Sequence, residues 1–213
     1  MTSPGRFRSH RIYASIYDRY NLGADLTWLG ESRRLVLAQA RGEVLEIGAG
    51  TGSNVELYRD VTRVVMSEPD PAFRRRLDNR VRWAEVPMEV CDAPAERLPF
   101  PDASFDTVIS TLTMCTVDDP AQVAREVRRV LRPGGVFAMV EHIRNDRPRV
   151  AFWQDLAVPA WRFLIGGCRP NRPTLETIAG AGFEIRELCR YDPPHVPFVM
   201  FPYVVAVAST NLE

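Results

Sequence analysis

The chain of 213 residues contains no lysine, no excess of charge of one sign and no long apolar run. All 27 basic residues are arginine, which excludes Schiff-base chemistry and any other mechanism that needs a catalytic lysine. The 27 acidic residues balance them and no basic stripe is present, so we expect neither nucleic acid nor an anionic lipid surface as a partner. The apolar stretch from Val196 to Ala208 contains two prolines and is too short for a bilayer, so no integral membrane segment is expected.

Cysteine is also scarce. The four cysteines are well separated and form no C-x-x-C pair: Cys91, Cys115, Cys168 and Cys189. This spacing excludes zinc knuckles and redox dithiols, and a disulfide framework is not expected at this length. Residues Met1 to Arg11 lack the apolar segment of a signal peptide, so we expect reduced thiols in a cytoplasmic protein. The composition, 46% hydrophobic and 25% charged, is that of a globular protein, and the length predicts a single domain over residues 1–213.

Short apolar runs alternate with helical patterns along most of the chain, which predicts an α/β fold with parallel strands and crossover helices. Near-continuous apolar strands are typical of a sheet that is covered on both faces. Five strands are expected, at Val44 to Gly48, Arg63 to Ser67, within Val86 to Cys91, Phe105 to Ser110 and Val136 to Val140. A helix at Thr174 to Ala181 and strand-like runs at Phe183 to Leu188 and Phe198 to Ala208 follow.

Two aromatic-rich segments lie outside this alternation. Arg11 to Ala40 predicts one or two helices before the first strand, and Arg147 to Arg172 follows the fifth strand. Their aromatic residues either belong to the core or cover one pocket. On the second interpretation, residues 1–42 form a helical cover, residues 43–142 a cofactor-binding core, and residues 143–213 the acceptor-side helices and final strands.

The strongest motif is V-L-E-I-G-A-G-T-G-S-N, Val44 to Asn54. A strand that turns through Gly48, Gly50 and Gly52 into a helix is typical of nucleotide binding, because glycine permits positive φ and a close approach of the backbone to a ligand. The third glycine comes one residue earlier than in the dinucleotide pattern G-x-G-x-x-G. Glu46, two residues before the first glycine, is a poor neighbour for a pyrophosphate and suits a cationic, amine-bearing ligand.

A second acidic residue, Glu68, ends the second expected strand, 18 residues after Gly50. A carboxylate at this place can accept two hydrogen bonds from the ribose hydroxyls of a nucleoside. The alternative is a solvated acid at the end of a strand. Asp70 followed by Pro71 is instead typical of a helix N-cap with proline in the first turn.

Together with two later segments, these motifs resemble those of class I S-adenosylmethionine-dependent methyltransferases. The later segments are A-P-A-E-R-L-P-F-P-D-A-S-F-D, Ala93 to Asp106, and V-L-R-P-G-G, Val130 to Gly135. The resemblance covers about Glu43 to His142. It implies a Rossmann-like sheet of seven strands, mostly parallel with the last antiparallel, with helices on both faces.

The resemblance also implies how S-adenosyl-L-methionine and its product S-adenosyl-L-homocysteine bind. In that family the glycine turn holds the methionyl part, the acid after strand two holds the ribose, and the segment before L-P-F meets the adenine. Asp92 lies two residues further from L-P-F than the usual spacing, so either Asp92 or the backbone of Ala93 to Ala95 makes the adenine contact. The cofactor-binding residues implied are Glu46, Gly48, Ala49, Gly50, Gly52, Glu68, Asp92, Ala93, Ala95 and Thr111.

A narrower resemblance extends over most of the chain, to the branch that contains the animal microsomal alkyl-thiol methyltransferases. Ubiquinone and menaquinone C-methyltransferases are more distant relatives. The animal enzymes carry an N-terminal membrane-associating segment, and we expect none here. The segments that carry this resemblance are Ser110 to Val117, Val140 to His142, Trp153 to Trp161, Gly166 to Arg172 and Pro194-His195.

Methyl transfer from a sulfonium needs a base only when the acceptor must lose a proton, and a thiol with a pKa of about 8.5 ionises easily. His142 follows the fifth strand at the edge where open α/β sheets bind ligands. We weigh it as a base or substrate-orienting group against a hydrogen-bonded structural histidine, and His195 in the same way. The expected acceptor-pocket residues are Tyr17, Cys115, Trp153, Trp161 and Cys168, with a role in the core as the alternative.

Asp118 and Asp119 would suit a magnesium ion, but a helix cap before Pro120 explains them better, so no metal is expected. The expected function is methyl transfer to a small apolar acceptor, with a thiol as the first choice and C- or O-methylation of a quinone-like or natural-product ring as the alternative. Two rivals come from other classes, a nicotinamide oxidoreductase and a module that binds the cofactor without catalysis. The glycine spacing and Glu46 count against the first. The sequence carries no signal for the oligomeric state.

Overall fold

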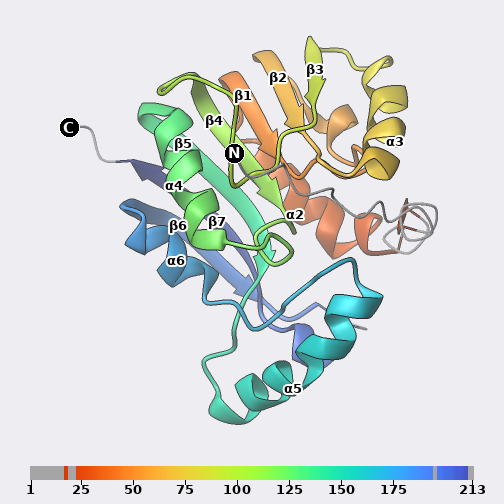
Figure 1. The fold of residues 1–213 in the computed structure, drawn as a ribbon, viewed down its shortest axis with the longest axis vertical. Helices are drawn as coiled ribbons and strands as arrows, with labels where there is room; N and C mark the ends of the chain where they lie inside the picture. The colour runs from red at the N-terminus through yellow and green to blue at the C-terminus, as the bar shows by residue number, and fades with distance from the viewer. Residues whose placement is uncertain (1–16, 19–22, 194–195, 211–213) are drawn as a thin grey trace, which may run out of the picture.

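The computed structural model describes residues 17–18, 23–193 and 196–210. Their strands form a seven-stranded sheet in the order β3-β2-β1-β4-β5-β7-β6 (Figure 1). Neighbours among β1 to β5 pair in parallel, and β7 lies antiparallel between β5 and β6. The mostly parallel, Rossmann-like sheet expected from the sequence is therefore confirmed.

The first five strands lie where the sequence predicts them. β5 is longer than the expected run because it begins directly after the preceding helix and includes the segment R-P-G-G. The bounds are β1 (Gly42–Ile47), β2 (Val61–Ser67), β3 (Met88–Cys91), β4 (Phe105–Thr111) and β5 (Leu131–His142).

The last two strands are β6 (Phe183–Tyr191) and β7 (Tyr203–Thr210). The prediction that strand structure begins at Phe198 is wrong, because Phe198–Met200 forms a 3-10 turn, η2, and the strand starts only at Tyr203. Pro197 and Pro202 flank this turn and lack the N–H that a strand needs, which explains the later start.

Two helices cover one face of the sheet, α2 (Trp28–Leu37) and α3 (Pro71–Val81) (Figure 1). They bury Leu29 and Leu77 in one apolar cluster with Met66 of β2. The N-cap expected for α3 is present, since the side chain of its N-cap aspartate accepts a hydrogen bond from the second residue of the helix.

Two more helices cover the other face, α4 (Pro120–Val130) and α6 (Thr174–Gly180). Val127 and Ile178 pack with Phe137 of β5 in a second apolar cluster. Apolar side chains therefore cover both faces of the central strands, as their near-continuous apolar sequences require.

Helix α5 (Pro148–Leu164) lies beyond the carboxyl end of β5, at the bottom of Figure 1. It packs against η2 and contains one internal proline, Pro159. The helix expected after the glycine turn is shorter than predicted, a single 3-10 turn η1 (Val55–Leu57). Only eight residues separate Gly52 from the start of β2, which leaves no room for a longer helix.

Candidate active site

A cavity of about 1380 Å³ opens at the carboxyl ends of the parallel strands. Ligand pockets in proteins usually measure about 300–1,000 Å³, so this cavity has room for two small molecules. The ends of β1, β2, β4 and β5 line it, together with the N-terminal segment and the region around α5. It occupies the edge of the sheet where open α/β folds bind ligands.

The glycine turn contributes backbone to this cavity. Gly48 has φ +62°, and a Cβ there would lie 2.4 Å from Cγ2 of Thr113. Gly50 has φ +60°, lines the cavity, and would place a Cβ in open space whose nearest atom is 3.9 Å away on Phe73. Ligand atoms can therefore approach the Gly50 backbone closely. Ala49 and Gly52 do not line the cavity, and Gly52 instead allows close packing against α3.

Glu68 lines the cavity directly after β2. Its Oε2 accepts a hydrogen bond of 2.8 Å from the amide of Gly50, and its Oε1 accepts one of 2.8 Å from the amide of Asp70. Each oxygen keeps a further lone pair for a hydroxyl in the cavity. Burial raises the pKa of Glu68 to about 7. These features fit a carboxylate that accepts hydrogen bonds from a ribose.

Glu46 does not line the cavity, in contrast to the sequence expectation. Its oxygens are satisfied below the turn, by the hydroxyl of Tyr58 at 2.7 Å and by Nδ2 of Asn54 at 2.9 Å. Nη1 of Arg33 donates to the other side of the Asn54 amide at 2.9 Å. Burial raises the pKa of Glu46 to about 7. Asn54 also donates to Oγ1 of Thr111, which does line the cavity, so Glu46 influences the site through this amide.

The segment expected near the adenine lines the cavity with residues that follow Asp92 in the chain. Asp92 is exposed and lies outside the cavity lining, and Ala93 is buried behind it. Ala95 and Glu96 line the cavity instead. The segment therefore meets the cavity at Ala95 and Glu96 and not at Asp92.

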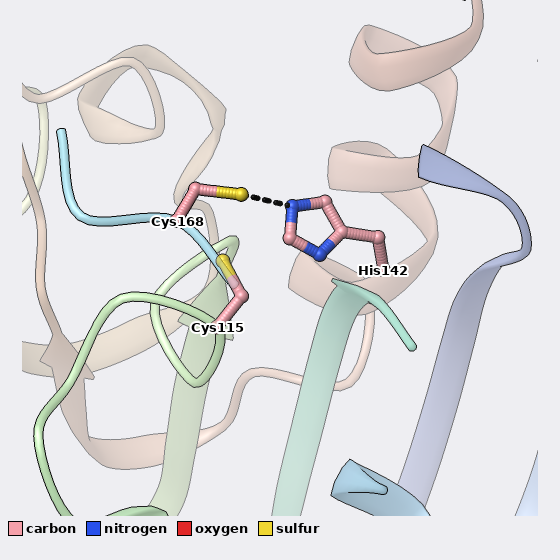
Figure 2. A group of neighbouring side chains, drawn as sticks. All are labelled: Cys115, His142 and Cys168. Carbon is pink, nitrogen blue, oxygen red and sulfur yellow. Dashed lines mark hydrogen bonds between the residues drawn. The ribbon is translucent and has the colours of Figure 1, made fainter. Parts of the chain in front are cut away.

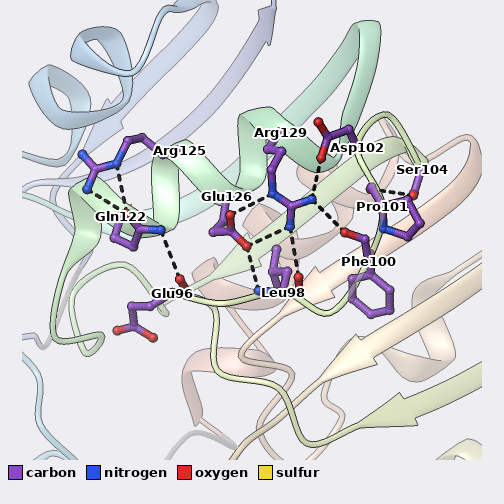
Figure 3. Close-up of polar contacts among 10 residues, drawn as sticks. All are labelled: Glu96, Leu98, Phe100, Pro101, Asp102, Ser104, Gln122, Arg125, Glu126 and Arg129. Atoms are coloured by element: carbon purple, nitrogen blue, oxygen red, sulfur yellow. Dashed lines mark hydrogen bonds and ion pairs between the residues drawn. The ribbon is translucent and has the colours of Figure 1, made fainter. Parts of the chain in front are cut away.

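Side chains of α4 hold this segment in place (Figure 3). Oε2 of Glu126 accepts from the amide of Leu98 at 2.8 Å, and Nη2 of Arg129 donates to the Leu98 carbonyl at 3.0 Å. Nη1 of Arg129 donates to the carbonyl of Phe100 at 2.8 Å, and Nε2 of Gln122 to that of Glu96 at 3.3 Å. The L-P-F motif is therefore clamped by the helix that precedes the V-L-R-P-G-G motif.

The N-terminal segment reaches the cavity at Tyr17. The Tyr17 ring contacts Phe73 edge-on with a centroid separation of 5.2 Å, and both rings line the cavity. Asp18 anchors the segment by accepting from Thr51 in the glycine turn and from Nη2 of Arg80 at 3.1 Å. Burial raises the pKa of Tyr17 to about 12, so its hydroxyl stays protonated.

Three of the expected residues meet at the other side of the cavity: Cys115, His142 and Cys168 (Figure 2). Nε2 of His142 lies 3.1 Å from Sγ of Cys168, and the ligand-type atoms of all three residues lie within 4.8 Å of one another. The three side chains are at most 3% exposed, yet each lines the cavity. Burial raises the pKa of the Cys115 thiol well above its ordinary value. Burial opposes a charge on His142, but Cys115 and Glu141 outweigh this effect and raise its pKa.

Neighbouring backbone fixes this cluster, here called the Cys-His-Cys cluster. Oε1 of Glu141 accepts from the amides of Thr113 and Met114 at 2.7 and 2.8 Å, which holds the loop that carries Cys115. The amide of Arg169 donates to the Cys115 carbonyl at 3.0 Å and joins this loop to the one that carries Cys168. The two loops are therefore positioned by contacts that do not involve the sulfur atoms.

The two tryptophans expected in the acceptor pocket lie in different places. Trp161 lines the cavity, and its Nε1 donates to the sulfur of Met200. Trp153 is 49% exposed and lines a separate apolar hollow with Leu156 and Phe198, so its placement in the acceptor pocket is wrong. Eight residues on an α-helix correspond to a rotation of about 80°, which takes the two side chains to different sides of α5.

The remaining candidates from the sequence are His195 and the acidic pair Asp118 and Asp119. His195 lies outside the described residues. Asp119 caps α4 by accepting from the amide of Gln122 at 2.9 Å, and Asp118 pairs with Arg169 at 3.2 Å. The helix cap expected before Pro120 is therefore confirmed for Asp119.

Several cavity residues are not assigned by sequence reasoning. Phe73 and Trp28 line the cavity, and Tyr203 packs edge-on against the His142 ring at 5.4 Å. Glu141 lies next to His142 in the motif V-E-H, and Asn54 ends the glycine motif. The sequence pattern of these motifs does not indicate which of their side chains contribute to the site.

Comparisons with known proteins place this geometry in a family. A family model described as a methyltransferase domain matches residues 45–139. The human thiol S-methyltransferase TMT1B is 34% identical over 178 residues, which cover 81% of this chain and 73% of that protein. The ubiquinone/menaquinone biosynthesis C-methyltransferase UbiE of Hahella chejuensis is 30% identical over 159 residues, covering 68% of this chain and 64% of that protein.

Among solved structures, a SAM-dependent methyltransferase and possible histamine N-methyltransferase from Thermotoga maritima has the same fold. Its TM-score is 0.70 at 21% identity, with 94% of this chain and 98% of that chain covered. Within the described residues, no helix combines the length and the apolar character needed to cross a membrane.

Proposed function

Since the chain belongs to the S-adenosylmethionine-dependent methyltransferases, we propose that it methylates the sulfur of a small, apolar thiol. Membership of this family sets aside the nicotinamide oxidoreductase as an alternative. The observation that carries the choice of acceptor is the Cys-His-Cys cluster, which lines the cavity beside an apolar surface and brings His142 to the end of β5.

The cofactor side of the cavity fits S-adenosyl-L-methionine. The open space over Gly50 accommodates the methionyl part, Glu68 accepts the ribose hydroxyls, and the backbone at Ala95 and Glu96 meets the adenine. Gly48 and Thr111 also line the cavity. Bound there, the cofactor supplies a methyl group on a sulfonium, whose bonding electron pair stays on the cofactor sulfur as S-adenosyl-L-homocysteine forms.

The acceptor side favours a small and apolar molecule. Trp161, Ile165 and Met200 line it, and Cys115 and Cys168 add thiols rather than charges. Apolar surface of this kind stabilises a lipophilic acceptor by about 25 cal/mol for each Å² removed from water. An alkyl or aryl thiol meets this description.

His142 is the group placed to handle the acceptor proton. A thiol must become a thiolate before its sulfur bonds to the methyl carbon, and Nε2 of His142 already bonds to a thiol, that of Cys168. We assign this nitrogen to take the acceptor proton, and the resulting imidazolium is stabilised by the neighbouring Glu141 carboxylate. Proton transfer of this kind typically contributes about 10²–10⁴-fold to the rate.

The names of the relatives support the same choice. The human proteins at 34% and 32% identity are called thiol S-methyltransferases. The similarity to the UbiE proteins, called C-methyltransferases, keeps methylation of a quinone-like ring as the second candidate. A cytoplasmic location, expected from the cysteine spacing, stays a prediction.

The test is a turnover assay that measures S-adenosyl-L-homocysteine release with an alkyl thiol, a catechol, a quinol and an amine. We expect release with the thiol alone and formation of the methyl thioether, identified by mass spectrometry. Release with the quinol but not with the thiol would contradict the proposal and favour the second candidate. Calorimetric binding of S-adenosyl-L-homocysteine to the same preparation serves as the control that the protein is folded.

A further inference from the structure

The Cys-His-Cys cluster is a set of metal ligands as well as a place for an acceptor. The wide spacing of the cysteines in the chain predicts no zinc knuckle, and Asp118 and Asp119 serve in an ion pair and a helix cap. Cys115, His142 and Cys168 nevertheless come together in the fold from three separate segments.

We propose that Cys115, His142 and Cys168 bind one zinc ion, with a fourth coordination position open toward the cavity. Two cysteines and one histidine form a ligand set typical of catalytic zinc, in which three protein ligands leave one position free. Two thiolates neutralise the charge of the ion, and soft sulfur ligands select zinc over magnesium or calcium.

The distances suit this coordination. Bonds of about 2.3 Å to sulfur and about 2.0 Å to nitrogen in a tetrahedron separate the ligand atoms by about 3.5–3.8 Å. The ligand atoms of the cluster lie within 4.8 Å of one another, and Nε2 of His142 and Sγ of Cys168 are 3.1 Å apart. Changes of about 1 Å, achieved by small side-chain rotations, bring them to a common centre.

The buried side chains of the Cys-His-Cys cluster are poorly satisfied by hydrogen bonds. His142 is 3% exposed, its Nδ1 has no hydrogen-bond partner among the described residues, and its side chain interacts with the thiols of Cys168 and Cys115. The Cys115 thiol also contacts the Leu112 carbonyl at 3.4 Å. Thiols are weak hydrogen-bond donors, so a buried imidazole is poorly satisfied by them, and a metal ion would supply the missing interaction.

The protein also holds the ligands in place before any ion binds. Glu141 fixes the loop of Cys115 through two amides, and the amide of Arg169 ties the loop of Cys168 to it. Nη1 of Arg172 donates to the Met114 carbonyl at 2.7 Å and adds a second link between the loops. Outer contacts that orient ligands in this way are typical of metal sites.

The use of the open position rests on the proposed function, whereas the site itself does not. An acceptor thiol that coordinates zinc loses its proton to water, and its sulfur then carries the electron pair that forms the bond to the methyl carbon. With the ion bound, His142 is a ligand, and the ion lowers the pKa of the acceptor in place of the base. Both arrangements deliver a thiolate at the same wall of the cavity.

The experiment uses Co²⁺ as a spectroscopic probe of the reduced, metal-free full-length protein. We expect one Co²⁺ per chain, with the intense visible absorption of tetrahedral cobalt–thiolate coordination, and displacement of that absorption by one equivalent of Zn²⁺. Cys168→Ser and Cys115→Ser should weaken Co²⁺ binding at least tenfold and lower the thiolate charge-transfer band. The matched controls Cys91→Ser and Cys189→Ser, which lie outside the cluster, should leave the spectrum unchanged.

Binding of S-adenosyl-L-homocysteine to each variant shows that it is folded, because Glu68 and the glycine turn are not part of the cluster. No tetrahedral cobalt spectrum from wild-type protein that binds this ligand would overturn the zinc site, as would a spectrum that Cys168→Ser leaves intact. Neither readout requires an acceptor. A protein that binds Co²⁺ as expected but methylates no thiol would therefore contradict the proposed function alone.

Discussion

Nε2 of His142 and Sγ of Cys168 lie 3.1 Å apart, although the two residues are 26 positions apart in the chain. The contact joins the carboxyl end of β5 to the loop after α5, inside the cavity that the cofactor turn also lines (Figure 2). It brings a proton acceptor and a sulfur atom together at an apolar wall.

Glu68→Ala should weaken binding of S-adenosyl-L-homocysteine by about 1–3 kcal/mol, since it removes a charged acceptor of two hydroxyl hydrogen bonds. Isothermal titration calorimetry measures this directly. Asp92→Ala is the matched control, because this aspartate is exposed and outside the cavity lining, and it should leave the affinity unchanged. An unaltered affinity in Glu68→Ala would refute the ribose assignment.

The affinity for the cofactor should also decrease as the pH is lowered. Burial raises the pKa of Glu68 to about 7, so the carboxyl becomes protonated below that value in the free protein and accepts hydroxyl hydrogen bonds less well. We expect Kd for S-adenosyl-L-homocysteine to rise as pH decreases from about 8 to about 6, and this dependence to vanish in Glu68→Ala. A pH profile shared by both proteins would mean that another group controls binding.

Glu46 should make the protein less stable as pH rises. Its folded pKa is about 7 and its ordinary value is 4.5, so between these two values the folded state holds a proton that the unfolded state has lost. Its contribution to the free energy of unfolding therefore declines over this range, by at most about 1.4 kcal/mol per pH unit, and is constant above it. Relative to wild type, Glu46→Gln should gain stability between pH 4.5 and 7 in urea titrations; parallel curves for the two proteins would contradict the assignment.

His142→Asn should slow methylation of an alkyl thiol by roughly 10²-fold or more at neutral pH, because the variant cannot promote loss of the thiol proton. The loss should be smaller for an aryl thiol of lower pKa, which ionises without help. This pattern holds whether the imidazole acts as base or as zinc ligand. Equal losses for both thiols, measured as kcat/KM, would instead indicate a purely structural histidine.

Trp161→Ala should raise KM for an apolar thiol roughly tenfold, since it removes aromatic surface from the acceptor side of the cavity. Trp153→Ala is the internal control on the same helix, because Trp153 lines a different hollow, and its KM should stay within about twofold of wild type. Affinity for S-adenosyl-L-homocysteine should be unaffected in both. The reverse order of the two effects would place the acceptor outside this cavity.

The first five strands could be located from the sequence because each is a local apolar run, whereas the start of the last strand was placed too early, at Phe198. The glycine turn and Glu68 also lie within a short stretch, so the spacing alone places them on one edge of the sheet. The L-P-F segment shows the limit of spacing. Asp92 lies outside the cavity lining, and the segment is held by Glu126 and Arg129 of α4, contacts that spacing in the sequence does not reveal.

The sequence pattern could not predict the directions of side chains or the contacts between distant segments. Glu46 turns below the glycine turn because Tyr58 and Asn54 satisfy its oxygens there, a preference that no period in the sequence encodes. Trp153 and Trp161 share a motif but not a side of α5. The meeting of Cys115 and Cys168 depends on two loops joined by backbone hydrogen bonds across the fold.

The central claim is that a thiolate forms at the cavity wall and receives the methyl group. The most direct measurement compares an alkyl thiol with the alcohol of the same carbon skeleton, using a cofactor whose methyl group is deuterated. We predict a deuterated methyl thioether from the thiol, released with one equivalent of S-adenosyl-L-homocysteine, and no product from the alcohol. Methylation of the alcohol at a comparable rate, or of neither compound by protein that binds the cofactor, would contradict it.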